Sequence, residues 1–171
     1  MTRVLLLGCM LLLTLHAGGL DFRQILTLKT VKNVALRYPN KKGQTLEDTA
    51  MAICLAETSG GKVKWGDKQL LRKGIKKASY GIMQVRLATA RFVAKRYNLL
   101  DVRMMSDTQL ITRMMHDPVF NARIAVLYLV YLSDTSGSYF EAISRYNGGR
   151  VNHPYYNKVQ RCLRIIRRHN L

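Results

Sequence analysis

Apolar residues recur every three or four positions along most of the chain, which is the spacing of amphipathic α-helices. Alternating strand patterns are scarce, although a short hairpin fits the Gly- and Lys-rich loop Gly60–Lys77. The predicted helices span Phe22–Tyr38, Thr45 to about Glu57, Leu87–Tyr97, Asp107–Met115, Pro118–Ser133, Tyr139–Tyr146 and Pro154–His169. We therefore expect a mainly α fold with at most a small β-hairpin after the second helix.

Three of these helices begin with capping signals. Thr45 and Asp48 resemble a capping box, with Asp in place of the usual Glu. The Ser106–Gln109 segment is a second capping box, and Asp117 precedes Pro118 at the first position of the next helix. The signals at Ser106 and Asp117 are the stronger ones.

The first residues resemble a secretory signal peptide. Arg3 gives a positive start, Val4–Leu15 are nearly all apolar, and the small residues Ala17–Gly19 follow. The apolar run is well short of the ~20 residues that span a bilayer, which disfavours a membrane anchor. We expect residues 1–19 to be a leader cleaved between Ala17 and Leu20, and residues 20–171 to act in the periplasm.

The remaining ~150 residues are the usual size of one domain, and no linker or repeat divides them.

The formal charge of the chain is +18, and loss of Arg3 with the leader leaves +17. Such a charge predicts an anionic partner, namely nucleic acid, a membrane surface or an acidic polymer such as the cell wall. Export disfavours nucleic acid. A cluster near the C-terminus, Arg161, Arg164, Arg167 and Arg168, is either part of such a contact or a solvated helix face.

Cys54 and Cys162 are the cysteines that remain after removal of the leader. They either pair in an oxidising compartment or stay as buried thiols, and their spacing does not decide between the two. No cysteine or histidine pair has the spacing of metal ligands. We therefore expect neither a metal site nor a cofactor.

The second predicted helix places an acid among its apolar residues. At ~100° per residue, Leu46, Ala50, Ile53 and Cys54 share one face, and Glu57 lies in the middle of it. A buried carboxylate is costly unless it is paired, protonated or functional. A buried salt bridge and catalysis both explain Glu57, and its position at the helix end, just before two glycines, favours catalysis.

Four short motifs follow one another in the chain. They are Ala56-Glu57-Thr58-Ser59, Ser79-Tyr80-Gly81-Ile82-Met83-Gln84 with Thr89-Ala90 behind it, Arg145-Tyr146-Asn147-Gly148-Gly149, and Tyr155-Tyr156-Asn157-Lys158-Val159. Together they resemble the Glu-Ser, Gly-Leu-Met-Gln, Ala-Tyr-Asn-x-Gly and Tyr-Val-x-x-Val motifs of the soluble-type lytic transglycosylases. The resemblance spans about Thr45 to His169. One departure is Thr58, which stands where the family has Ser and keeps the hydroxyl, while Ser59 is an alternative source of that group.

The resemblance implies a goose-type lysozyme fold and peptidoglycan as the substrate. In that family an acid protonates the leaving oxygen, the N-acetyl group of the substrate assists at C1, and the same residue then acts as base on the C6 hydroxyl. Glu57 takes this role, and a 1,6-anhydromuramoyl end forms. The substrate-binding residues that the resemblance implies are Thr58, Ser59, Ser79, Gly81, Met83, Gln84, Tyr146, Asn147 and Tyr155.

Individual roles follow from the same resemblance. Met83 and Gln84 line the cleft near Glu57, while Tyr146 and Asn147 face it from the opposite wall. Tyr155 hydrogen-bonds toward the Glu or the N-acetyl group, and Gly81 is a backbone requirement. The single tryptophan, at position 65, either stacks on a sugar or packs as a lid.

Two other functions fit the same fold. A goose-type lysozyme would use water and leave reducing ends, and a second carboxylate opposite Glu57 would favour it. A non-catalytic wall-binding or secretion-scaffold protein would keep the fold with an inert Glu57.

We expect a monomer without a stable membrane anchor or nucleic-acid partner. Secretion, conjugation or flagellar machines and general wall turnover are equally suitable settings.

The leader gives a first testable prediction. Protein purified from its native host should lack at least its first seventeen residues, because the small residues after the apolar run fit a cleavage site. Mass spectrometry of the N-terminal peptide measures this directly. An intact Met1 in that protein would contradict the prediction.

Overall fold

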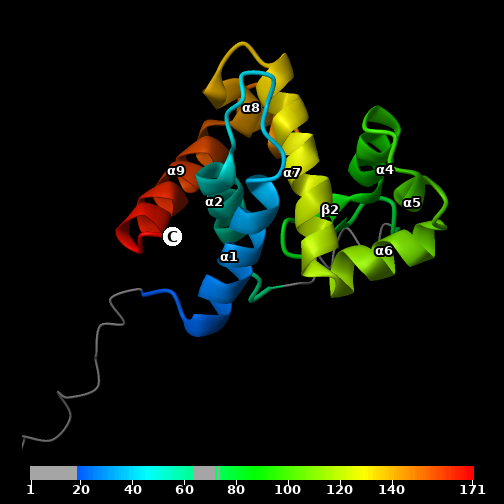
Figure 1. Cartoon of the computed structure of the whole chain (residues 1–171), viewed down its shortest axis with the longest axis horizontal. Coiled ribbons are helices and arrows are strands. Elements are labelled where there is room, and N and C mark those ends of the chain that lie inside the picture. Colours follow the sequence, from blue (N-terminus) through cyan, green and yellow to red (C-terminus); the bar gives the residue numbers. More distant parts are fainter. Residues whose placement is uncertain (1–18, 64–71, 73) are drawn as a thin grey trace, which may run out of the picture.

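The computed structural model describes residues 19–63, 72 and 74–171, which form a mainly helical fold with one small β-hairpin (Figure 1). The helices are α1 (Phe22–Ala35), α2 (Glu47–Thr58), α4 (Leu87–Arg96), α5 (Leu100–Arg103), α6 (Asp107–His116), α7 (Pro118–Thr135), α8 (Tyr139–Tyr146) and α9 (His153–Arg168). The strands are β1 (Ser79–Tyr80) and β2 (Val85–Arg86). The mainly α fold predicted from the sequence is confirmed.

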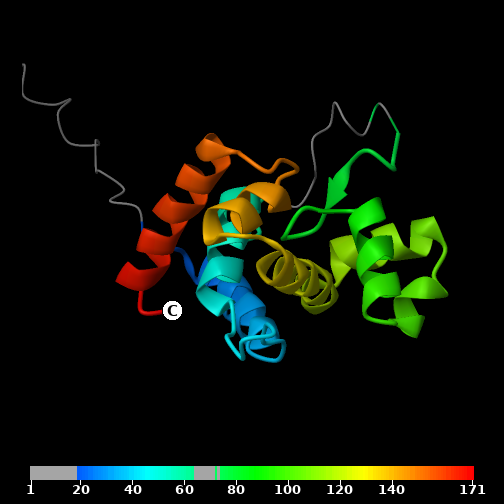
Figure 2. The same ribbon diagram turned by 90° about the horizontal axis from the view of Figure 1, so that it is seen from above.

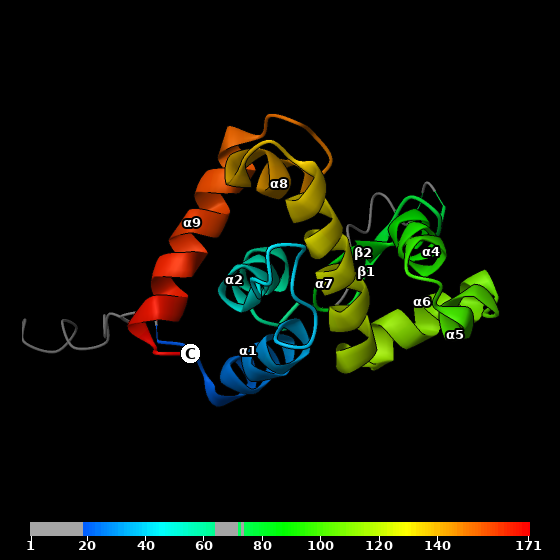
Figure 3. The same cartoon turned by 45° about the horizontal axis from the view of Figure 1, so that its top comes forward.

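Helix α2 lies at the centre of the fold. It packs against α1 and α9, and α7, α8 and α9 continue the ring of helices around it (Figure 3). The hairpin and helices α4, α5 and α6 form a second group on the far side of α7 (Figure 2). This arrangement puts the end of α2 beside the hairpin.

The surroundings of α2 correct the predicted apolar stripe. Residues 49–54 are all buried, as are Ala56 and Thr58, so the helix has no solvent-exposed face along most of its length. The sequence pattern suggested a helix with one buried side, but neighbours on several sides cover it. Small side chains such as Ala50, Ala52 and Ala56 let those neighbours approach closely. Glu57 is therefore one of the few residues of this helix that reach open space.

The predicted helix ends agree with the structure to within three residues. Two of the three predicted caps form, and one does not. The capping box at Ser106–Gln109 is confirmed, and the side chain of Asp117 accepts a hydrogen bond from the Phe120 amide at 2.9 Å. The capping box at Thr45 is wrong, because Leu46 occupies the cap position without a side-chain hydrogen bond. Glu47 and Asp48 instead place negative charge at the positive end of the helix dipole.

The hairpin pairs Ser79 with Arg86 and Tyr80 with Val85. It forms from the second motif, whereas half of the loop predicted to hold a hairpin, residues 60–77, lies outside the described residues. The side chain of Asn121 on α7 fixes the hairpin turn. Its amide nitrogen donates to the Tyr80 carbonyl at 3.0 Å, and its oxygen accepts from the Met83 amide at 2.8 Å.

Four other predictions concern the leader, the tryptophan, the membrane anchor and the cysteines. The predicted leader, residues 1–19, lies outside the described residues except for its last position. The tryptophan at 65 also lies outside them. Within the described ranges, no helix combines the length and apolar character needed to cross a bilayer. Cys54 and Cys162 are both free, buried thiols, and burial raises the pKa of Cys54 to about 12.

The packing of Gly81 gives a second prediction. Its φ of +74° is equal to that of Gly43, but a Cβ on Gly43 would meet nothing, whereas one on Gly81 would clash with the Met114 carbonyl and the Asn121 amide. Gly43→Ala should cost about 1–2 kcal/mol for the left-handed backbone. Gly81→Ala should cost a further ~1–3 kcal/mol for the clash.

Urea unfolding of both variants measures the difference. If Gly43→Ala and Gly81→Ala lower the free energy of unfolding equally, the hairpin can move away from its neighbours without cost, and the predicted clash at Gly81 is wrong.

Candidate active site

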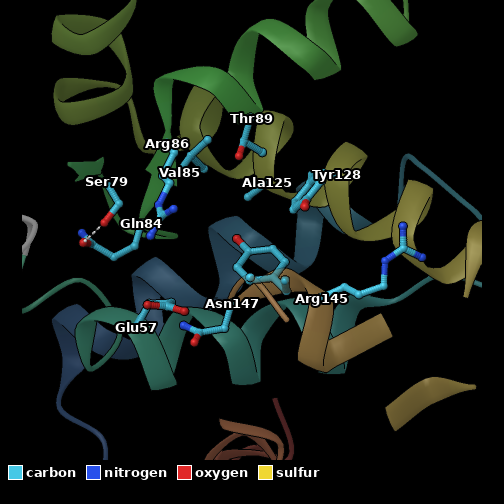
Figure 4. A pocket seen from close by; sticks show the side chains of 12 residues that line it. Glu57, Ser79, Gln84, Val85, Arg86, Thr89, Ala125, Tyr128, Arg145 and Asn147 are labelled. Carbon is cyan, nitrogen blue, oxygen red and sulfur yellow. Dashed lines mark hydrogen bonds between the residues drawn. The ribbon is translucent and has the colours of Figure 1, made fainter. Parts of the chain in front are cut away.

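Glu57 lies in the last turn of α2, where the chain leaves the helix. Ser59 ends the helix in a left-handed conformation with φ of +53°. Around the carboxyl group, residues from α2, the hairpin, α4, α7 and α8 form a cleft (Figure 4). The cleft is lined by Glu57, Ser79, Gln84, Val85, Arg86, Thr89, Ala125, Tyr128, Arg145, Tyr146, Asn147 and Gly148.

The Glu57 carboxyl is held by a tyrosine from the last helix. The Tyr155 hydroxyl donates to Oε1 of Glu57 at 2.6 Å. Tyr155 is buried in the first turn of α9, and its amide donates to the capping side chain of Asn152 at 3.1 Å. The start of α9 therefore fixes both the backbone and the hydroxyl of the group that orients Glu57.

Three effects set the pKa of Glu57. Burial raises it, and this effect is the largest, while the hydrogen bond from Tyr155 and the positive charge of Lys158 lower it. The net result is a pKa above the ordinary value of 4.5. Burial and the nearby Glu57 also raise the pKa of Tyr155, so Tyr155 remains a hydrogen-bond donor. The arrangement allows Glu57 to hold a proton closer to neutral pH than an exposed acid does.

Thr58 lies beneath the cleft and not on its surface. Its side chain is 1% exposed, and its hydroxyl lies 2.7 Å from the Ile82 carbonyl and accepts from the Gly61 amide at 2.9 Å. The prediction that Thr58 touches substrate is therefore corrected, because its hydroxyl is used to join the end of α2 to the hairpin. Ser59 is exposed but does not line the cleft, and its carbonyl accepts from the side chain of Gln24.

Ser79 and Gln84 come together on the hairpin wall of the cleft. The Ser79 hydroxyl donates to the Gln84 side-chain oxygen at 2.9 Å, and the Gln84 amide nitrogen donates to the Gly81 carbonyl at 2.9 Å. Gln84 has φ of +49°, a conformation that non-glycine residues seldom adopt. These contacts and the tight turn hold the Gln84 amide at the edge of the cleft (Figure 4).

Met83 and Tyr146 connect the hairpin to α8. The Met83 side chain is fully buried, which corrects the prediction that it lines the cleft. Its carbonyl accepts from the Tyr146 hydroxyl at 3.0 Å. The Met83 side chain thus packs in the core beneath the hairpin turn. Tyr146 and the neighbouring Asn147 do line the cleft, as predicted for the third motif. The side-chain oxygen of Asn147 accepts from Asn152 at 3.1 Å.

Several residues that line the cleft were not predicted as site residues. Thr89 belongs to the Thr-Ala part of the second motif, and Arg86 lies between the two parts of that motif. Arg145 opens the third motif at the position where the family has Ala. These three had a sequence signal in their proximity to the motifs. Tyr128 had none, because only the packing of α7 brings it into the cleft. Arg145 also has a structural role, since it donates to the Thr135 carbonyl at 3.0 Å and to the Ser136 hydroxyl at 2.8 Å.

Glu57 is the one acid among the described residues that line the cleft. Of the other glutamates, Glu141 accepts from the Gly137 amide at 2.9 Å and pairs with Arg150, and Glu47 lies at the opposite end of α2. Across the described residues, no group of three or more acidic, histidine or cysteine side chains is placed to hold a metal ion.

Comparisons with known proteins agree with the position of the motifs. The family model described as transglycosylase SLT domain matches residues 35–164. This segment contains every element that lines the cleft, together with Tyr155. No curated protein and no solved structure matches the chain significantly.

The burial of Glu57 predicts an unusual effect of pH on stability. Because its pKa is raised in the folded state, the folded protein loses stability as the pH rises through that raised pKa. Glu57→Gln does not titrate, so it should unfold at a higher temperature than the wild type near pH 7–8. This gain should vanish below the ordinary pKa of 4.5, where the carboxyl is protonated in both states.

Glu141→Gln is the matched control with the opposite sign. The Gly137 amide and Arg150 lower the pKa of Glu141, so its carboxylate contributes stability above pH 4.5 that is lost as the pH falls. Thermal unfolding of the three proteins between pH 3 and pH 8 measures both effects. A Glu57→Gln variant less stable than wild type at pH 8 would contradict the assignment.

Proposed function

The chain belongs to the transglycosylase SLT domain family, and we propose that it is a peptidoglycan lytic transglycosylase. It cleaves the β-1,4 bond between N-acetylmuramic acid and N-acetylglucosamine and leaves a 1,6-anhydromuramoyl end. The observation that carries the proposal is the one acid among the described residues of the cleft, the half-buried Glu57, whose carboxyl accepts a 2.6 Å hydrogen bond from Tyr155.

The first step uses Glu57 as an acid. Cleavage of a glycosidic bond needs a proton on the leaving oxygen while positive charge builds on the sugar ring. The raised pKa of Glu57 supports this role, because a larger fraction of the carboxyl groups carries the proton at the pH of the reaction. The Tyr155 hydroxyl binds one carboxyl oxygen, which leaves the other oxygen to face the sugar.

The second step needs a nucleophile for C1. Glu57 is the one acid among the described residues that line the cleft, so no second carboxylate is there to attack C1. The carbonyl oxygen of the substrate's N-acetyl group bonds to C1 instead, as the glycosidic bond breaks. The Glu57 carboxylate then takes the proton of the C6 hydroxyl. O6 bonds to C1 and displaces the N-acetyl oxygen, so that Glu57 is protonated again and no water is consumed.

Other residues of the cleft bind the sugars. Gln84 and Asn147 present amide groups from opposite walls, and Ser79 adds a hydroxyl beside Gln84. Amides and hydroxyls suit sugar hydroxyl and N-acetyl groups, because they donate and accept hydrogen bonds without adding charge. Tyr146 supplies an apolar ring at the same place. The predicted leader would deliver the enzyme to the periplasm, where peptidoglycan lies.

Replacement of Glu57 tests the proposal. Glu57→Gln keeps the size of the side chain and removes the proton transfers, so turnover of purified sacculi should fall by at least ~10²-fold. Binding to sacculi should persist, and Glu141→Gln should keep wild-type turnover because Glu141 lies outside the cleft. Release of soluble fragments gives the rates.

Mass analysis of the wild-type fragments separates the remaining functions. Products with 1,6-anhydromuramic ends support the transglycosylase, whereas reducing ends together with an inactive Glu57→Gln indicate a goose-type lysozyme. A wild type that binds sacculi without releasing fragments would indicate a wall-binding scaffold. Near-normal activity of Glu57→Gln would show that the acid is assigned wrongly.

A further inference from the structure

The outer face of α9 carries a row of arginines. The buried residues of this helix include Tyr155, Val159 and Ile166, which face α2. On the opposite side, Arg161, Arg164 and Arg168 are exposed and follow one another at the three- and four-residue spacing of a single helix face. We name these three residues the α9 stripe. Figures 1 and 3 show α9 at the edge of the molecule, with its outer side uncovered by the other labelled helices.

No acid neutralises this stripe within the described part of the chain. Helix α9 contains no Asp or Glu, and the ion pairs of the described residues all lie elsewhere. The flanking side chains Lys158 and Arg167 are exposed and positive as well. Like charges at this spacing disfavour a helix. The helix dipole favours cations in the last turn, which accounts for Arg167 and Arg168, but Arg161 and Arg164 lie too far from the end.

The chemistry of the stripe favours a carboxylate-bearing polymer over a membrane. A guanidinium group is a planar fork of donors that pairs with carboxylate or phosphate oxygens. Helices that enter the surface of a bilayer expose large apolar side chains beside their cations. The large apolar side chains exposed in the described residues all lie outside α9, whose apolar face is buried in the core.

We propose that the α9 stripe is a docking surface for the stem-peptide carboxylates of peptidoglycan, separate from the cleft that holds the glycan. The proposal rests on the proposed function for the identity of the polymer. No residue of α9 lines the cleft, so the two surfaces can be occupied together. At 1.5 Å per residue, the stripe extends for about 10 Å along the helix and can reach more than one carboxylate. Docking at several points keeps the cleft near its next bond.

The test compares two triple variants that lose the same charge. The first is Arg161→Gln, Arg164→Gln and Arg168→Gln in one chain. The control replaces Arg37, Lys95 and Arg96 with glutamine; these residues are also exposed but lie in α4 and in the turn after α1. Both are made with and without Glu57→Gln, so that binding to sacculi is measured by co-sedimentation without cleavage.

Affinity at low salt should fall roughly three- to a hundredfold for the stripe variant, as expected for the loss of three exposed ion pairs. It should fall much less for the control. The remaining binding of the stripe variant should also depend less on salt. With Glu57 intact, the stripe variant should degrade sacculi more slowly but cleave short soluble fragments at the control rate.

Further substrates identify the ligand. On glycan strands stripped of their peptides by an amidase, the two triple variants should bind alike. Equal losses on intact sacculi would overturn the proposal in favour of net charge, and a stripe-specific loss on stripped strands would overturn it in favour of sugar contacts. A stripe-specific loss on phosphatidylglycerol vesicles and not on sacculi would indicate a membrane surface instead. Thermal unfolding confirms that each variant is folded. Binding is read without turnover, so a failure of the proposed activity leaves this result interpretable.

Discussion

The whole fold depends on a central helix that is buried along most of its length and ends in an acid. A helix in this position must be built from small and apolar residues, because polar groups there would lack partners and large ones would push the neighbouring helices apart. Helix α2 meets this requirement from Thr49 to Ala56. Its charged groups lie at its two ends, Glu47 and Asp48 in the first turn and Glu57 in the C-terminal turn. The position of Glu57 is therefore a consequence of the packing as much as of the chemistry.

Two hydrogen bonds tie distant parts of the chain to that turn, and a third ties α8 to the hairpin beside it. Thr58 reaches the Ile82 carbonyl, Tyr155 reaches Glu57, and the Tyr146 hydroxyl reaches the carbonyl of Met83, next to Ile82. Since these bonds join α2, the hairpin, α8 and α9, a shift of any one element moves the others. The geometry around Glu57 is thus supported by side chains from three helices and by the turn of the hairpin, which suits the precise positioning that proton transfer requires.

The sequence predicted what depends on local pattern and missed what depends on contact across the fold. The cap at Ser106 forms within one turn and was correct, whereas Thr45 has the right residue type one position too far from the helix. Motif matching located Thr58 and Met83 near the site, but it cannot distinguish a residue under the cleft from one on its surface. Tyr128 carries no pattern of its own.

The electrostatics of the chain has to reconcile a strongly positive surface with an acid that must hold its proton. Each cation close to Glu57 stabilises the carboxylate and lowers the pKa of the group. Among the described residues, Lys158 is the cation whose charge has a resolved effect on Glu57, and burial outweighs it. Cations that lie further from the carboxyl affect its pKa less, because salt screens their charge over ~8 Å. The core side of α9 orients Glu57 through Tyr155, whereas the arginines of the α9 stripe lie on the exposed face of the same helix. The arginines of the α9 stripe can thus present charge to an acidic polymer without a resolved effect on the pKa of Glu57, whereas Lys158 of the same helix does lower that pKa.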